Sequence, residues 1–204
     1  KDKSCLWGVK LGVESVSSEG AYKPIAAIKE RYDLSKIATP HFAEIAGVED
    51  IKSRVLELTD GILQIVEKTD SLSWGPFEYA VSMRGLENLM MDMIEAPDFV
   101  HELMSRITDG FISYQIEREK AGKVFTDIPC ITHVPYDTPV EENRKNTLKG
   151  CWAYIHAQSS GVISPEMYAE FVHPYNCKLA AMVGKVYYHG CEDLSQKCSI
   201  IKNM

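Results

Sequence analysis

Apolar residues recur at helical spacing through the middle of the chain. They return every three or four positions between residues 86 and 94 and again between residues 99 and 112, which is the pattern of helices that bury one face. These positions are Leu86, Leu89, Met90, Met93, Ile94, Phe99, Val100, Leu103, Met104, Ile107, Phe111 and Ile112. Pro97 separates the two helices, because proline suits a first helical turn and the residue before it avoids the helical conformation. The second helix is expected to end near Gly122, since glycine commonly follows a helix C-terminus.

Short apolar runs elsewhere predict β-strands. These runs cover residues 62–66, 123–127, 151–155 and 186–188. Near the N-terminus, residues 1–25 contain glycines and a serine-rich turn, which favour a short hairpin or a loop. Residues 128–150 contain three prolines among polar residues and predict a long irregular loop, a kind of segment that is usually functional or mobile.

Further helical segments separate the predicted strands. They are expected from 47 or 48 to 59, from 76 to 83, from 164 or 165 to 184 with a kink at Pro174, and from 193 to 202. From residue 62 onward, strands therefore alternate with helices, which favours a parallel sheet with crossover helices. The fold class is α/β. In a (β/α)₈ barrel of the TIM type, the chemistry lies at the C-terminal ends of the strands.

Composition narrows the functional classes. The chain has 204 residues, 45% of them hydrophobic and 25% charged, which is typical of one globular domain. A net charge of −7 argues against a nucleic-acid surface, and no apolar run approaches the roughly 18 residues of a membrane span. The N-terminus does not resemble a signal peptide. Six scattered cysteines lack the density of a disulfide scaffold, so reduced thiols in a cytoplasmic enzyme are expected.

The strongest chemical candidates follow the last predicted strand. His189 and Cys191 flank Gly190, and strand alternation would point both side chains the same way. Imidazole and thiolate are both good zinc ligands; the alternative is a core histidine beside a small buried cysteine. The next residue, Glu192, is a candidate for orienting His189 or for acid–base chemistry, although acidic residues are also common in the first turn of a helix.

Other candidates lie at the ends of neighbouring strands. Asp127 ends the predicted strand 123–127, where it could bind substrate or act as an acid or base. His156 and Gln158 follow the strand 151–155 and are candidates for substrate binding. Trp152 is a candidate for an aromatic wall of the same site, and it is equally suited to an ordinary core.

Four stretches of the sequence resemble one known family. They are SMRGLENLMMDMIEAPDFVHELM at 82–104, FTD at 125–127, VISPEMYAEFVHPYNCKL at 162–179 and YYHGCEDLSQKCSIIKNM at 187–204. Together they resemble the uroporphyrinogen decarboxylase superfamily, in its corrinoid-linked methyltransferase branch. The resemblance covers much of the chain from residue 82 onward, whereas residues 1–60 match weakly.

This resemblance implies a TIM-type barrel and a zinc site. In the methyltransferase branch, a His-x-Cys pair at a strand end and a cysteine from a later strand hold zinc, which activates a thiol or polarises a methyl ether. A methyl group then passes between a small methyl donor or thiol and the cobalt of a separate corrinoid protein. His189 and Cys191 match the His-x-Cys pair.

The third zinc ligand of the family has no counterpart in this chain. Family members continue through further strands, so we expect residues 1–204 to form a single, incomplete barrel domain. Two alternatives remain open. One is a metal-free decarboxylase of the same superfamily, which needs clustered arginines, but those of this chain are dispersed: Arg31, Arg54, Arg84, Arg106, Arg118 and Arg144. The other is a non-catalytic barrel fragment.

Overall fold

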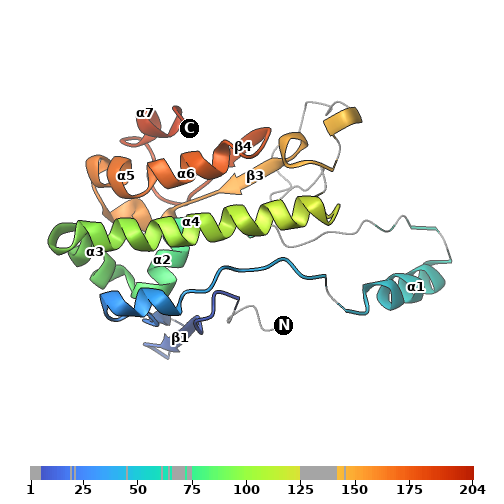
Figure 1. Cartoon of the computed structure of the whole chain (residues 1–204), viewed down its shortest axis with the longest axis horizontal. Coiled ribbons are helices and arrows are strands. Elements are labelled where there is room, and N and C mark those ends of the chain that lie inside the picture. Colours follow the sequence, from blue (N-terminus) through green and yellow to red (C-terminus); the bar gives the residue numbers. More distant parts are fainter. Residues whose placement is uncertain are drawn as a thin grey trace.

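A computed structural model of the chain describes residues 6–18, 20, 22–44, 46–60, 62–63, 65, 72, 75–124, 142–144 and 146–204. The described residues form a mixed α/β structure (Figure 1). Its elements in chain order are β1 (Gly12–Ser15), β2 (Tyr22–Ile25), the 3₁₀ helix η2 (Arg31–Lys36), α1 (Val48–Thr59), α2 (Pro76–Arg84), α3 (Leu86–Glu95), α4 (Pro97–Lys120), the 3₁₀ helices η3 (Glu142–Arg144) and η4 (Leu148–Gly150), β3 (Trp152–Ile155), the 3₁₀ helix η5 (Gln158–Val162), α5 (Pro165–Phe171), α6 (His173–Ala180), β4 (Lys185–Tyr188) and α7 (Cys198–Ile201).

The long helix α4 is the centre of the molecule. It begins at Pro97, as the sequence predicts, and packs against α2 and α3 as well as against α5 and α6 (Figure 1). Its buried stripe follows the predicted helical period, and Val100, Leu103 and Ile107 are completely buried. Each side chain of this kind contributes about 1.5–3 kcal/mol when it leaves water. The apolar pattern of α4 therefore positions the helices on both of its sides.

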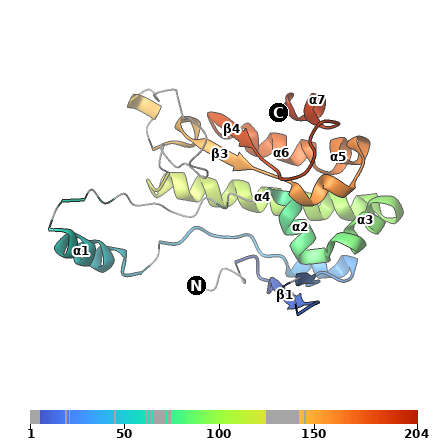
Figure 2. The ribbon, with the colours of Figure 1, turned by 180° about the vertical axis from the view of Figure 1, so that it is seen from behind.

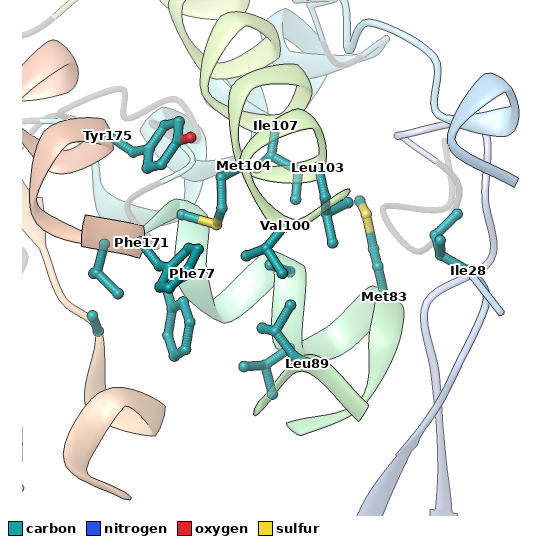
Figure 3. Packing of buried hydrophobic residues seen from close by; sticks show 14 of the residues in the cluster. Ile28, Phe77, Met83, Leu89, Val100, Leu103, Met104, Ile107, Phe171 and Tyr175 are labelled. Atoms are coloured by element: carbon teal, nitrogen blue, oxygen red, sulfur yellow. The ribbon is translucent and has the colours of Figure 1, made fainter. Parts of the chain in front are cut away.

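The main core lies where α4 meets the neighbouring helices. Figure 3 shows Phe77 and Met83 of α2 and Leu89 of α3 packed around the α4 residues Val100 and Met104. Phe171 of α5 and Tyr175 of α6, which come from the other side of α4, belong to the same cluster.

Proline divides the segment between residues 165 and 180 into two helices. The Ser164 side chain accepts a hydrogen bond from Met167 N at 3.2 Å, and Pro165 opens α5 as predicted. The expected kink at Pro174 is a break at Val172, where the backbone leaves helical geometry and α6 begins. Pro174 has no N–H to continue the helical ladder, so it is accommodated in the first turn of a new helix.

Two small sheets are present among the described residues. Of the two possibilities for the N-terminal segment, a hairpin or a loop, the structure has the hairpin, since β1 and β2 pair antiparallel. The predicted strands 151–155 and 186–188 are confirmed as β3 and β4, which pair parallel with Tyr154 opposite Tyr187 and Ile155 opposite Tyr188. Parallel strands require a crossover, and η5, α5 and α6 supply it. Figure 2 shows this pair from behind, beside α6.

The predicted sheet is larger than the observed one. Ile62, Leu63 and Ile65 are not in a strand, and the first two are 82% and 62% exposed, so the prediction of a buried strand at 62–66 is wrong for these residues. An apolar run becomes a strand only where a neighbouring strand satisfies its backbone groups. Of the strand expected at 123–127, the structure describes only residues 123 and 124, and neither is in a strand; residues 125–127 lie outside the described residues. A closed barrel is therefore not found in the described part of the chain.

The helix predicted at 193–202 is shorter than expected. Within this range the structure has a helix only at α7; residues 195–197 form a turn, and Asp193 and Leu194 have no regular secondary structure. The carboxylate of Asp193 accepts a hydrogen bond from Ser195 N at 2.9 Å, which stabilises a turn in competition with a helical start.

Helix α1 has the predicted bounds but an unexpected place. It lies away from the other helices in both views and buries none of its own residues (Figures 1 and 2). No helix among the described residues is both long enough and apolar enough to cross a membrane.

Candidate functional site

The two faces of the β3–β4 pair have different surroundings. On one face Ile155 is buried, and the Tyr188 hydroxyl accepts a hydrogen bond of 3.1 Å from Tyr168, a completely buried residue of α5. Burial and the neighbouring Tyr168 raise the pKa of Tyr188 far above its ordinary range, so both phenols are protonated. This face anchors the sheet to the helices.

The opposite face carries a ladder of aromatic rings. The ring of Tyr154 lies 5.1 Å from His156, 6.0 Å from Tyr187 and 5.8 Å from His189, measured between ring centroids. These four side chains are half-buried. The C-terminal ends of β3 and β4 therefore bring the two predicted histidines, His156 and His189, into one aromatic group.

His189 is held by both its backbone and its ring. Its N–H donates to the Ile155 carbonyl at 3.0 Å, which continues the strand pairing by one residue. Its Nδ1 lies 3.0 Å from the Tyr154 hydroxyl, within hydrogen-bond distance. The contact occupies Nδ1 and leaves Nε2 as the nitrogen that can bind a ligand.

Gly190 provides the space for the side chain of Glu192. A methyl group at Gly190 would lie 1.8 Å from Oε2 and 2.4 Å from Oε1 of Glu192, so the carboxylate covers the Gly190 backbone. The Glu192 Cβ also packs close to Gly161. Both carboxylate oxygens are buried, and neither has a hydrogen-bond partner among the described residues. Desolvating a carboxylate without a partner is unfavourable, so this placement is one that function can exploit.

Cys191 presents an exposed thiol between Gly190 and Glu192. The structure therefore places an imidazole, a thiol and a carboxylate within four consecutive residues at the end of β4. In the described ranges, no three histidine, cysteine, aspartate or glutamate side chains already converge closely enough to hold a metal ion.

His156 sits where the end of β3 meets α2. A methyl group at Gly75 would lie 1.9 Å from the His156 carbonyl oxygen, which shows how closely the two backbones approach. Burial lowers the pKa of His156, and His189 contributes in the same direction, while the carboxylates of Glu78 and Glu192 oppose the shift. His156 is consequently a neutral imidazole near neutral pH.

Glu78 of α2 fixes the loop that follows His156. Its carboxylate accepts a hydrogen bond of 2.8 Å from Ser159 N and one of 2.7 Å from the Ser159 hydroxyl. The residues are 81 positions apart in sequence, so no local pattern indicates the contact.

Lys197 is a buried cation beside this group that the sequence pattern did not reveal. It is 4% exposed, its ammonium donates to the Ser160 carbonyl, and it lies 5.6 Å from the centre of the Tyr168 ring. Burial lowers the pKa of Lys197, and the negative charge of Glu192 opposes that shift. A lysine within a predicted amphipathic helix is ordinarily assigned to a solvated face, which is why the pattern misses it.

The remaining predicted site residues lie elsewhere. Trp152 begins β3, at the end of the strand away from His189, and the Lys185 ammonium lies 5.0 Å from the centre of its ring. Gln158 begins η5 and is exposed. Asp127 lies outside the described residues.

The sequence matches no model of a known protein family and no curated protein.

Proposed function

We propose that the chain belongs to a zinc-dependent methyltransferase of the uroporphyrinogen decarboxylase superfamily, which moves a methyl group between a small methyl donor or thiol and a corrinoid protein. The observation that carries the proposal is the arrangement at the end of β4. His189, with Nδ1 already engaged, and Cys191, with an exposed thiol, follow a strand that is paired parallel with β3. Imidazole nitrogen and thiolate are the donor types that zinc favours.

The neighbouring residues suit such a metal site. A metal-ligating histidine usually donates its other ring N–H to an outer partner, and the Tyr154 hydroxyl lies at the required distance. The buried carboxylate of Glu192 lies over Gly190, between the two proposed ligands in sequence, and has no hydrogen bond among the described residues. A bound cation would compensate the charge of this carboxylate. When bound, zinc would lower the pKa of a substrate thiol or polarise a methyl-ether oxygen.

In this proposal, His189 and Cys191 are two of the three protein ligands expected of catalytic zinc. We assign the third to a part of the protein outside the described residues. Catalytic centres of that fold lie at the C-terminal ends of strands, which is where His189 and Cys191 follow β4. In this proposal, neutral His156 binds substrate on the aromatic face, and Glu192 takes up or releases a proton.

Arg84 of α2 and Arg118 of α4 do not support the decarboxylase alternative, because each guanidinium is engaged within the protein. The Arg84 guanidinium pairs with Asp92 through contacts of 2.6 and 3.0 Å and so joins α2 to α3. Arg118 is buried and donates to the Lys123 carbonyl at 3.0 Å. Both guanidiniums serve the packing of helices.

Metal binding tests the proposal directly. The protein should bind Co²⁺ with the absorption band of a thiolate ligand and should bind about one zinc per chain. His189→Ala and Cys191→Ala should both abolish the band, whereas Cys198→Ala, which removes another exposed thiol, should leave it unchanged. Equal binding by all four proteins would refute the assignment. A supporting activity measurement is methyl transfer to or from a reduced corrinoid, lost in the same two variants.

A further inference from the structure

The hydroxyl of Tyr154 contacts a ring nitrogen of His189 across the two strands. The two residues are 35 positions apart in sequence and meet only because β3 and β4 pair in parallel, with Tyr154 opposite Tyr187 and with His189 N donating to the Ile155 carbonyl. The contact joins Tyr154 Oη to His189 Nδ1 at 3.0 Å.

Aromatic neighbours hold the Tyr154 ring in place. His156, on the same strand, lies 5.1 Å from it, and Tyr187, on the partner strand, lies 6.0 Å from it, with interplanar angles of 33° and 32°. A ring packed between such neighbours has little rotational freedom, so its hydroxyl is presented to His189 in one direction. Tyr187 is close to the same imidazole, at 5.9 Å between ring centroids, but no hydrogen bond joins them in the described structure.

We infer that Tyr154 is a positioning residue that occupies His189 Nδ1 and so selects Nε2 as the nitrogen that binds the metal. This inference rests on the proposed function. Nδ1 and Nε2 are chemically distinct ligands on opposite sides of the ring, and the hydrogen bond made by one decides which is free for the other role. With the metal on Nε2, Nδ1 carries the proton and donates it to the Tyr154 oxygen, which also increases the basicity of the ligand.

The backbone explains why His189 needs such a partner. Gly190 follows it directly, and Cys191 is exposed, so the chain beyond His189 leaves the sheet. Without the Tyr154 hydroxyl, the imidazole could rotate about its side-chain bonds and present either nitrogen. The contact with Tyr154 therefore fixes the orientation of the His189 ring at the end of β4.

The test compares Tyr154→Phe with Tyr187→Phe, which removes the hydroxyl of the neighbouring ring and serves as the matched control. In the metal-free protein, the ¹⁵N resonance of His189 Nδ1 should shift in Tyr154→Phe and stay unchanged in Tyr187→Phe. In the Cd²⁺-loaded wild type, metal–nitrogen scalar coupling should appear at Nε2 alone. Tyr154→Phe should bind Zn²⁺ about 10–100-fold more weakly than wild type, and Tyr187→Phe should bind it like wild type.

The outcomes separate the inference from the function on which it rests. If His189→Ala abolishes zinc binding while Tyr154→Phe keeps wild-type affinity and coupling at Nε2, the positioning role is overturned and the metal site stands. If His189→Ala leaves zinc binding intact, both are overturned. A metal-free Nδ1 resonance that does not respond to Tyr154→Phe overturns the contact itself, whatever metal the protein binds.

Discussion

Gly190→Ala is the sharpest test of how the end of β4 is built. An added methyl group would lie 1.8–2.4 Å from the carboxylate atoms of Glu192, far inside van der Waals contact. The backbone of Gly190 is not left-handed, so alanine fits its conformation. The atoms in the way are the far end of a flexible side chain, and the carboxylate therefore moves out towards solvent while the backbone stays in place.

The expected sign of the effect is an increase in stability. Releasing a buried carboxylate that lacks a hydrogen bond should recover up to about 1–3 kcal/mol, less the attraction between Glu192 and the buried Lys197 ammonium. Replacing glycine with alanine at a compatible position adds about 0.4–1 kcal/mol through the unfolded state. Exposing methylene groups of Glu192 offsets part of this, at about 0.8 kcal/mol for each group fully exposed. The net expectation is a gain of about 1–2 kcal/mol.

Urea unfolding of four proteins isolates the contact: wild type, Gly190→Ala, Glu192→Ala and the double variant. Gly190→Ala should stabilise the wild type, and in the Glu192→Ala background only the glycine-to-alanine contribution of about 0.4–1 kcal/mol should remain. Gly12→Ala is the matched control, since its methyl group would meet only the Ile25 side chain at an ordinary 3.5 Å. If Gly190→Ala is equally destabilising in both backgrounds, Glu192 does not cover Gly190. If the buried Glu192 carboxylate supports the proposed metal site, Gly190→Ala and Glu192→Ala should weaken zinc binding by similar factors.

Two further predictions concern contacts made by Trp7 and Asp33, both near the N-terminus. A methyl group at Gly110 in α4 would lie 2.4 Å from the Trp7 ring. Gly110→Ala should therefore destabilise the protein by about 1–3 kcal/mol through overpacking, offset in part by a gain of about 1 kcal/mol in helix propensity. Urea unfolding should show that this penalty is smaller in a Trp7→Leu background. An undiminished penalty there would exclude Trp7 as the obstacle. Hydrogen bonds from Lys36 and from two backbone N–H groups lower the pKa of Asp33 to about 2, so Asp33 stabilises the fold above about pH 4 and this contribution is lost as pH falls towards 2. Acid unfolding should therefore be less steep in Asp33→Asn over that window, and identical profiles would contradict the assigned contacts.

The helical framework could be predicted from the sequence because each helix carries its own signals. The ends of α4 follow from Pro97 and Gly122, and its buried face follows from apolar spacing. The run at 62–66 has the composition of a strand, but a strand also needs a partner, which the run itself does not specify. The predicted helix at 193–202 failed at its start because Asp193 offers the backbone a local alternative.

The candidate site also has one part that the sequence indicates and one part that it does not. His189, Cys191 and Glu192 could be selected from local sequence because they are consecutive or nearly so and follow a strand. The contact of Glu192 with the Gly190 backbone, and the closeness of His156 to His189, depend on how loops fold back after two separate strands. Tyr154 and Glu78 gain their roles from partners 35 and 81 residues away, so a single sequence has no pattern that indicates them.

The register of β4 against β3 is what turns a short sequence motif into a site. Side chains alternate between the two faces, so a slip of one residue would turn His189 towards the helices and Tyr188 towards the aromatic face. Such a slip would break the Tyr168–Tyr188 hydrogen bond on one side and the Tyr154–His189 contact on the other. Both faces therefore specify the same register, and the backbone bond from His189 N to Ile155 extends it one residue past the strand. The position of His189 is thus a property of the strand pair, and substitutions on the helix-facing side, such as Tyr168→Phe, should reach the proposed metal ligand only if they shift that register.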